Sequence, residues 1–169
     1  MLKCLTFVVF AILAVLTGAT GAQAQVNVTY LDFEGRAFVT TNPTSGTCQA
    51  QQISFGSVDT VVYRFTLNPA SVRESLSFTG SRESKRIEST VAPGYSLNGL
   101  KNVRWDGIDT RAGLTTDLLT TSDLTIKPIA GTGITKTTTG VTITGTVNDY
   151  LFVTGCTVTI TAALVRRPD

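Results

Sequence analysis

The chain has 169 residues, of which 14 are basic and 12 acidic, and it contains no histidine. This near-neutral balance argues against nucleic-acid binding, which needs a marked basic excess on one face. The lack of histidine excludes Ser-His-Asp and Cys-His catalysis and the common zinc sites. We therefore expect a protein that is not an enzyme and that uses no cofactor or metal.

Residues 1–24 have the pattern of a cleaved signal peptide. Lys3 supplies the positive start, residues 5–16 form an apolar run, and Ala22-Gln23-Ala24 matches the small-x-small cleavage pattern. The apolar run is too short for a permanent membrane span and no second such run follows, so we expect no transmembrane segment after cleavage. The mature chain, 25–169, is predicted to be a single all-β domain that is secreted or periplasmic.

Two cysteines remain after Cys4 leaves with the signal peptide. In an oxidising compartment Cys48 and Cys156 are expected to form a disulfide. It would close a loop of roughly 100 residues, for which the chain-entropy model gives about 4–5 kcal/mol. Free buried thiols are the alternative, and no histidine is present to activate a catalytic thiolate.

The first half of the domain has alternating strand-like runs. Residues 26–33 and 36–41 are either two strands joined at Glu34-Gly35 or one bent strand, and a loop over 42–46 leads to Cys48. Residues 51–56 and 59–67 form the next predicted pair. Along the second of these, four apolar side chains share one face, which makes it the best core strand of this half. They are Val61, Tyr63, Phe65 and Leu67.

The middle of the chain mixes turn and strand patterns. Residues 69–75 are consistent with one helical turn, and Leu76 and Phe78 then resume a strand face. The charged stretch 81–86 has mixed signs, which favours a solvated hairpin tip over an anionic-ligand or membrane-surface patch. Asn98-Gly99 between two strand-like runs predicts a type I′ hairpin.

A candidate ligand loop follows, made of Trp105, Asp106, Asp109 and Arg111. Trp105 is expected to pack in the core, with sugar stacking or a partner contact as the alternative. The two aspartates are placed to face a cation, but an Asx turn or an ion pair with Arg111 explains them equally, so no metal is assigned. Residues 114–124 are ambiguous between a short helix and an irregular crossover.

The strongest pattern lies at the end of the chain. Residues 124–129 return to strand, 130–140 form a Gly/Thr-rich hairpin end, and 140–165 hold a central antiparallel pair turning at Asn148-Asp149. The pair should carry threonines on one face, at 142, 144 and 146 and at 157, 159 and 161. A half-exposed sheet face explains this array, and a role in ice binding or surface adhesion is the more specific alternative.

The spacing of strand and turn signals predicts an antiparallel β-sandwich or flattened barrel of about eight to ten strands, with one disulfide and little helix. We expect an exported, non-enzymatic binding or interaction module. Its partner is an envelope or extracellular protein, a polymer or a small ligand. One alternative is an inhibitor of an exported hydrolase, presenting a loop from the disulfide-tied scaffold. Another is a hydrolase that uses paired carboxylates, although no sequence signal selects a pair.

Overall fold

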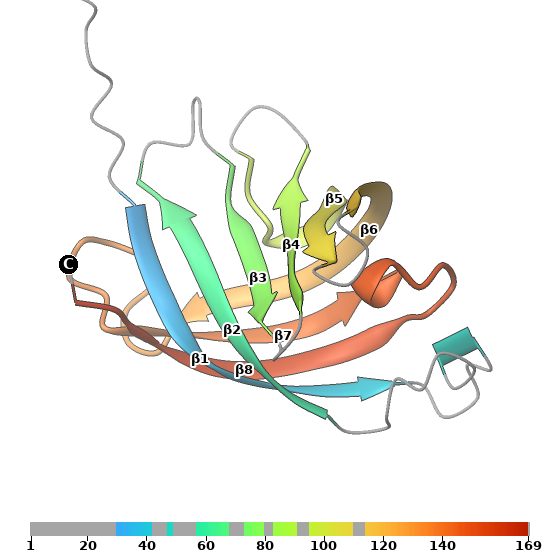
Figure 1. Cartoon of the computed structure of the whole chain (residues 1–169). Helices are drawn as coiled ribbons and strands as arrows, with labels where there is room; N and C mark the ends of the chain where they lie inside the picture. Colours follow the sequence, from blue (N-terminus) through green and yellow to red (C-terminus); the bar gives the residue numbers. More distant parts are fainter. Residues whose placement is uncertain are drawn as a thin grey trace, which may run out of the picture.

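Eight antiparallel strands close into a single barrel (Figure 1). The computed structural model describes residues 30–41, 47–48, 57–67, 73–79, 83–90, 95–109 and 114–168. The expected signal peptide lies outside these ranges. The elements in chain order are β1 (Tyr30–Thr41), β2 (Ser57–Thr66), β3 (Ser75–Thr79), β4 (Glu83–Ser89), β5 (Gly99–Asp109), β6 (Leu114–Pro128), β7 (Gly140–Val147), the 3₁₀ turn η1 (Tyr150–Phe152) and β8 (Val158–Arg166).

Each strand pairs with the next in sequence, and β8 returns to pair with β1 from Phe33↔Arg166 to Thr41↔Val158. The predicted all-β antiparallel fold with little helix is thus confirmed as a closed barrel, and the sandwich alternative is wrong. In the described residues each strand thus has a neighbour on both sides, whereas an open sheet would expose two edge strands to other chains.

Strict alternation fills the barrel interior. Along β8, Val158, Ile160 and Leu164 are buried while Thr159 and Thr161 are exposed. An eight-stranded barrel is just wide enough for side chains from all strands to meet at its centre. The predicted face of this strand and its antiparallel pairing with β7 are both confirmed.

β1 is one continuous strand, which confirms one of the two expected alternatives. A Cβ atom on Gly35 would lie 2.7 Å from the carbonyl oxygen of Ala163 in β8. The missing side chain lets the two backbones approach at this point. The strand therefore passes through Glu34-Gly35 without a turn.

Two of the expected local structures are wrong. Asn98-Gly99 does not form a hairpin, because Asn98 makes an isolated bridge to Leu124 while Leu97 is buried. Residues 114–124 are neither helix nor crossover, because β6 pairs with β5 from Asp109↔Leu114 to Gly99↔Leu124. Pairing on both sides of β6 overrode the local helical pattern. The helical turn expected at 69–75 falls mostly outside the described residues, and Ser75 begins β3.

The link between β7 and β8 is longer than the predicted Asn148-Asp149 turn. Asp149 has a left-handed backbone with φ 50°, as expected, but the chain then forms η1. Tyr150 N donates to the carbonyl oxygen of Cys156 at 2.9 Å. This fold-back places the Tyr150 side chain inside the barrel end.

The two barrel ends differ. We call the end that holds Cys48, Cys156 and the 148–157 link the disulfide end; it lies to the right in Figure 1. We call the opposite end, where β2 ends and β3 begins, the pocket end. It carries the segment 95–98 and the Gly/Thr-rich link 129–139, which joins β6 to β7 as predicted.

Candidate functional site

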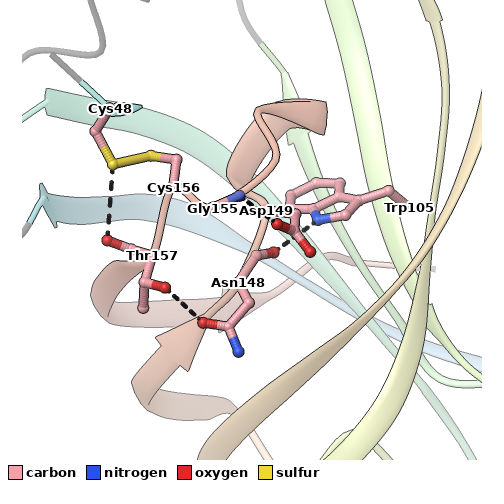
Figure 2. Close-up of a disulfide and its surroundings, with 7 residues drawn as sticks. All are labelled: Cys48, Trp105, Asn148, Asp149, Gly155, Cys156 and Thr157. Carbon is pink, nitrogen blue, oxygen red and sulfur yellow. Dashed lines mark hydrogen bonds between the residues drawn. A yellow bond between two sulfur atoms is a disulfide. The ribbon is translucent and has the colours of Figure 1, made fainter. Parts of the chain in front are cut away.

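Cys48 and Cys156 form the predicted disulfide, with their Cα atoms 4.8 Å apart. Figure 2 shows this bond beside the Asn148-Asp149 corner. Thr157 Oγ1 donates to Asn148 Oδ1 at 2.6 Å, and Gly155 N donates to Asp149 Oδ1 at 2.6 Å. The disulfide therefore links the chain after β1 to the Asn148-Asp149 corner, which its own hydrogen bonds already hold in place.

Trp105 lies in the core of the disulfide end, and its exposed fraction is 0 %. Its indole Nε1 donates to the carbonyl oxygen of Asn148 at 3.1 Å (Figure 2). Its ring packs against Phe78, Tyr150 and Phe152, with centroids 5.7 to 5.9 Å away. The expected core role of Trp105 is confirmed.

The remaining members of the predicted ligand loop do not converge on Trp105. Asp106 is on the opposite, outer face of β5, where Arg86 Nη2 donates to its Oδ2 at 2.5 Å. The strand β5 continues to Asp109, so the expectation that Trp105, Asp106 and Asp109 belong to a loop is wrong. The side chain of Asp109 and all of Arg111 lie outside the described residues, and their ligand role stays a prediction.

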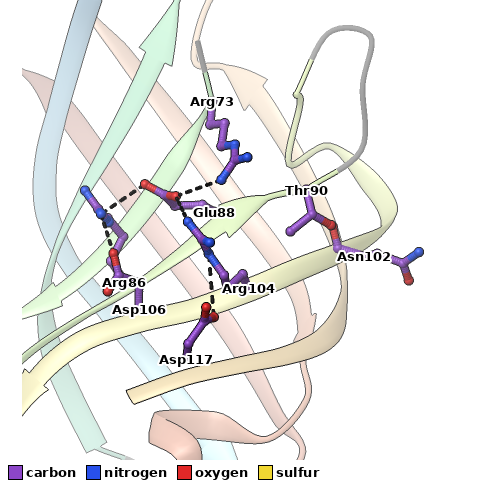
Figure 3. A network of polar contacts seen from close by, with 8 residues as sticks. All are labelled: Arg73, Arg86, Glu88, Thr90, Asn102, Arg104, Asp106 and Asp117. Carbon is purple, nitrogen blue, oxygen red and sulfur yellow. Dashed lines mark hydrogen bonds and ion pairs between the residues drawn. The ribbon is translucent and has the colours of Figure 1, made fainter. Parts of the chain in front are cut away.

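The outer face of β4, β5 and β6 carries a network of ion pairs (Figure 3). At its centre, Glu88 contacts Arg86 at 3.1 Å, Arg104 at 3.3 Å and Arg73 at 3.7 Å. Arg104 also contacts Asp117 at 3.6 Å. Because internal carboxylates already neutralise these arginines, the network offers little to an external anion. Arg82, from the same charged stretch, lies outside the described residues.

The predicted threonine array exists on the outer wall. Thr144 is opposite Thr161, and Thr146 is opposite Thr159. The pairing extends to Thr125 on β6 and Thr40 on β1. These strands belong to a curved barrel wall (Figure 1). A role in ice binding or adhesion stays a prediction.

A pocket of about 330 Å³ opens at the pocket end. Its volume is near the lower limit of small-molecule sites. The walls combine apolar and polar side chains in similar measure. The lining residues are Tyr63, Phe65, Glu74, Ser96, Asn98, Ile126, Lys127, Pro128, Thr132, Gly133 and Ile134.

Glu74 is the buried polar group of this pocket, with an exposed fraction of 4 %. Its Oε2 accepts hydrogen bonds from Tyr63 OH at 2.9 Å, Leu97 N at 3.0 Å and Ser96 Oγ at 3.3 Å. All three bonds go to the same oxygen. In the described part of the chain, no donor is bonded to Oε1.

Backbone contacts fix the position of Glu74. Its N–H donates to the carbonyl oxygen of Tyr95 at 3.0 Å, and its own carbonyl oxygen accepts from Ser89 N at 3.4 Å. Ser96 Oγ also accepts from Asn98 N at 3.1 Å. The carboxyl is therefore held between the start of β3 and the segment 95–98 that crosses the pocket end.

The electrostatic setting of Glu74 is unusual for a carboxyl group. Burial raises the pKa of Glu74, while its three hydrogen bonds and the more distant Lys101 act in the opposite direction. Burial and the neighbouring Glu74 raise the pKa of Tyr63 well above its usual value. Among the described residues, no lysine or arginine forms an ion pair with Glu74.

No family model, no curated protein and no solved structure matches this chain. The functional interpretation therefore depends on the geometry of the pocket.

Across the described ranges, no helix is long and apolar enough to cross a membrane. In the same ranges, no three His, Cys, Asp or Glu side chains are grouped so as to hold a metal ion.

Sequence reasoning missed Glu74 because its stretch resembled a helical turn. One signal was present, since Glu74, Leu76 and Phe78 alternate at the spacing of one strand face. An acidic residue in line with two core residues is expected to point into the core. An acidic residue is seldom fully buried unless it is paired.

Proposed function

We propose that this protein is an exported, non-enzymatic binding module that holds a small ligand in the Glu74 pocket. The observation that carries this proposal is a buried carboxyl group that lines a preformed pocket and whose Oε1 has no donor in the described chain. Oε1 is accessible in the pocket, so a bound molecule that carries a hydrogen-bond donor can reach it.

The scaffold suits ligand binding. The closed barrel and the disulfide limit backbone rearrangement, so little ordering is needed when a ligand enters. The described lining contains Glu74 as its one carboxylate, whereas glycoside hydrolysis uses two. The pocket therefore favours binding over the alternative of a carboxylate hydrolase.

Thermal unfolding of the oxidised mature domain tests this function. The domain is heated with sugars, lipids, peptidoglycan fragments and small amines in turn. A ligand at 100 times its dissociation constant adds about 2.7 kcal/mol, which raises the midpoint by several degrees.

A blocking variant assigns the shift to the pocket. A Cβ atom on Gly133 meets nothing within 4 Å, so Gly133→Phe has room to fold and adds a bulky side chain to the pocket lining. Thr142→Phe, on the exposed outer face of β7, is the matched control. The shift should disappear in the first variant and persist in the second. A shift that survives Gly133→Phe would place the ligand elsewhere and overturn the proposal.

A further inference from the structure

We propose that the ligand is a small organic amine whose ammonium group binds Oε1 of Glu74 and whose body packs on the apolar side of the pocket. This inference rests on the proposed function and names its ligand class. Three features of the pocket support it.

The first feature is the direction of hydrogen bonding. Tyr63, Ser96 and Leu97 all donate to Oε2, which is the arrangement that stabilises an ionised carboxylate. The other oxygen then acts only as an acceptor. A ligand that bonds to it must bring an N–H or O–H donor.

The second feature is charge. A largely buried carboxylate is normally paired with a cation, and Glu74 has no ion-pair partner in the described chain. Lys101, on the inner face of β5, acts on Glu74 only at a distance, and Lys127 lies at the exposed rim. Arg73, the neighbour of Glu74 in sequence, is bound to Glu88 on the outer wall. An ammonium ion supplies the missing charge at contact distance.

The third feature is the wall of the pocket. Phe65, Ile126, Pro128 and Ile134 contribute apolar surface beside the Tyr63 ring. They give an apolar ligand body one side of the pocket to pack against, while polar side chains line the other side. The volume of about 330 Å³ accommodates a single substituted ring. The pocket thus combines one anionic anchor with a wall that is partly apolar.

Isothermal titration calorimetry with three probes of similar shape tests which polar group of the ligand the pocket prefers. The probes are 2-phenylethylamine, 2-phenylethanol and phenylacetate, added to the oxidised mature domain near neutral pH. The amine should bind about tenfold or more tightly than the other two. Binding of the amine should also weaken as the pH falls through the raised pKa of Glu74, because protonation removes the negative charge.

Glu74→Gln is the decisive variant. The glutamine carbonyl can still accept the three hydrogen bonds, while its NH₂ group takes the place of Oε1 and reverses the polarity there. Amine affinity should fall about tenfold or more. Asp123→Asn, which removes an exposed carboxylate from the outer face of β6, should leave it unchanged.

The outcomes separate the two proposals. If the alcohol or the acid binds as tightly as the amine and Gly133→Phe blocks it, the amine inference is overturned and the binding function stands. If none of the three probes binds, the amine inference is overturned, and the broader ligand panel decides the function. If Glu74→Gln does not fold, the pH profile of the wild-type chain decides instead, since an affinity that does not fall on acidification would refute an ammonium–carboxylate contact.

Discussion

Tyr63 and Glu74 show how one buried hydrogen bond links the core to the pocket. The Tyr63 ring packs between core residues, stacked on Phe33 with a centroid distance of 6.2 Å, while its hydroxyl reaches Glu74. The same side chain thus fills the barrel and orients the carboxyl. Such contacts to a charged group are stronger than those between neutral groups.

Tyr63→Phe removes this hydrogen bond and keeps the ring. We expect a loss of about 1.5–3 kcal/mol in the free energy of unfolding, because a bond to a charged buried group disappears. The pKa of Glu74 should rise further, since the lost donor favoured the charged form. Urea unfolding measures the loss, with Tyr30→Phe, an exposed tyrosine, as the matched control. Equal stability of the two variants would contradict the prediction.

The free energy of unfolding should depend on pH through the ionisation of Glu74. Its folded pKa is raised above the ordinary value of 4.5, so the folded state holds the proton more tightly than the unfolded chain. Its contribution to stability is therefore present below pH 4.5 and is lost as the pH rises through the folded pKa. Unfolding in urea across this range should show the decline in wild type, and Glu74→Gln should abolish it.

The contribution of Asp32 to stability should change with pH in the opposite direction to that of Glu74. Hydrogen bonds from Arg64, at 2.8 Å to each oxygen, lower the pKa of Asp32 below its ordinary value of 3.8. Its contribution is present above pH 3.8 and is lost as the pH falls through the folded pKa. Because the pair is partly exposed, the effect should be small, at most about 1 kcal/mol. Asp32→Asn in the same titration separates it from Glu74.

β6 and β7 are in close backbone contact at Gly145. This residue has φ 141°, and an added Cβ would collide with the carbonyl oxygen of Asp123 and lie 2.9 Å from Leu124 Cα. Neither neighbour can move without breaking the pairing of Gly145 with Leu124. The contact helps to bring β6 into the barrel wall next to the pocket, which Ile126 lines.

Gly145→Ala should therefore destabilise the barrel strongly. We expect a loss of about 3 kcal/mol or more, from backbone strain together with the steric clash. Gly133→Ala is the control, because nothing lies within 4 Å of its Cβ position and its φ is not in the left-handed region. Chemical denaturation compares the two, and a difference below about 1 kcal/mol would show that the strands separate at little cost.

The disulfide acts on the whole molecule by limiting the unfolded chain. It links residues 108 apart in sequence, while the β1–β8 pairing already closes the barrel in the folded state. The disulfide end and the pocket end lie at opposite ends of the strands, so loss of the bond should weaken the fold more than the pocket.

Replacing both Cys48 and Cys156 by alanine tests whether the disulfide stabilises the fold more than the pocket. The chain-entropy model gives a loss of about 4–5 kcal/mol, a large share of the stability of a typical domain. The far-UV circular dichroism spectrum of the folded variant should still be that of a β protein. A loss below about 1 kcal/mol would mean that the unfolded chain is already compact without the bond. Reduction of the wild-type domain should reproduce the result of the double substitution.

Local patterns in the sequence predicted much of the fold. The alternation in 158–165 predicted β8, its buried face and its pairing with β7, because both signals depend on neighbouring residues. The predictions failed where distant partners decided the outcome. Residues 114–124 became strand through pairing with β5, and Asn98-Gly99 lost its hairpin because Leu97 is buried at the pocket end.

The candidate site could not be predicted in the same way. Trp105 and Asp106 are adjacent in sequence, yet strand geometry sends their side chains to opposite faces of β5. Glu74 meets Tyr63, Ser96 and Leu97 only because the strands close into a barrel and the segment 95–98 crosses its end. No short stretch of sequence contains these contacts.

The sequence by itself determined the β character, the alternating core positions and the cysteine pair, because side-chain periodicity and residue type are local properties. Tertiary structure decided the closure of β1 on β8, the aromatic packing around Trp105 and the pocket around Glu74. Closure depends on the cumulative twist and stagger of all eight strands. The charge state and hydrogen bonding of Glu74 depend in turn on burial and on donors from two separate segments, which only the closed barrel brings together.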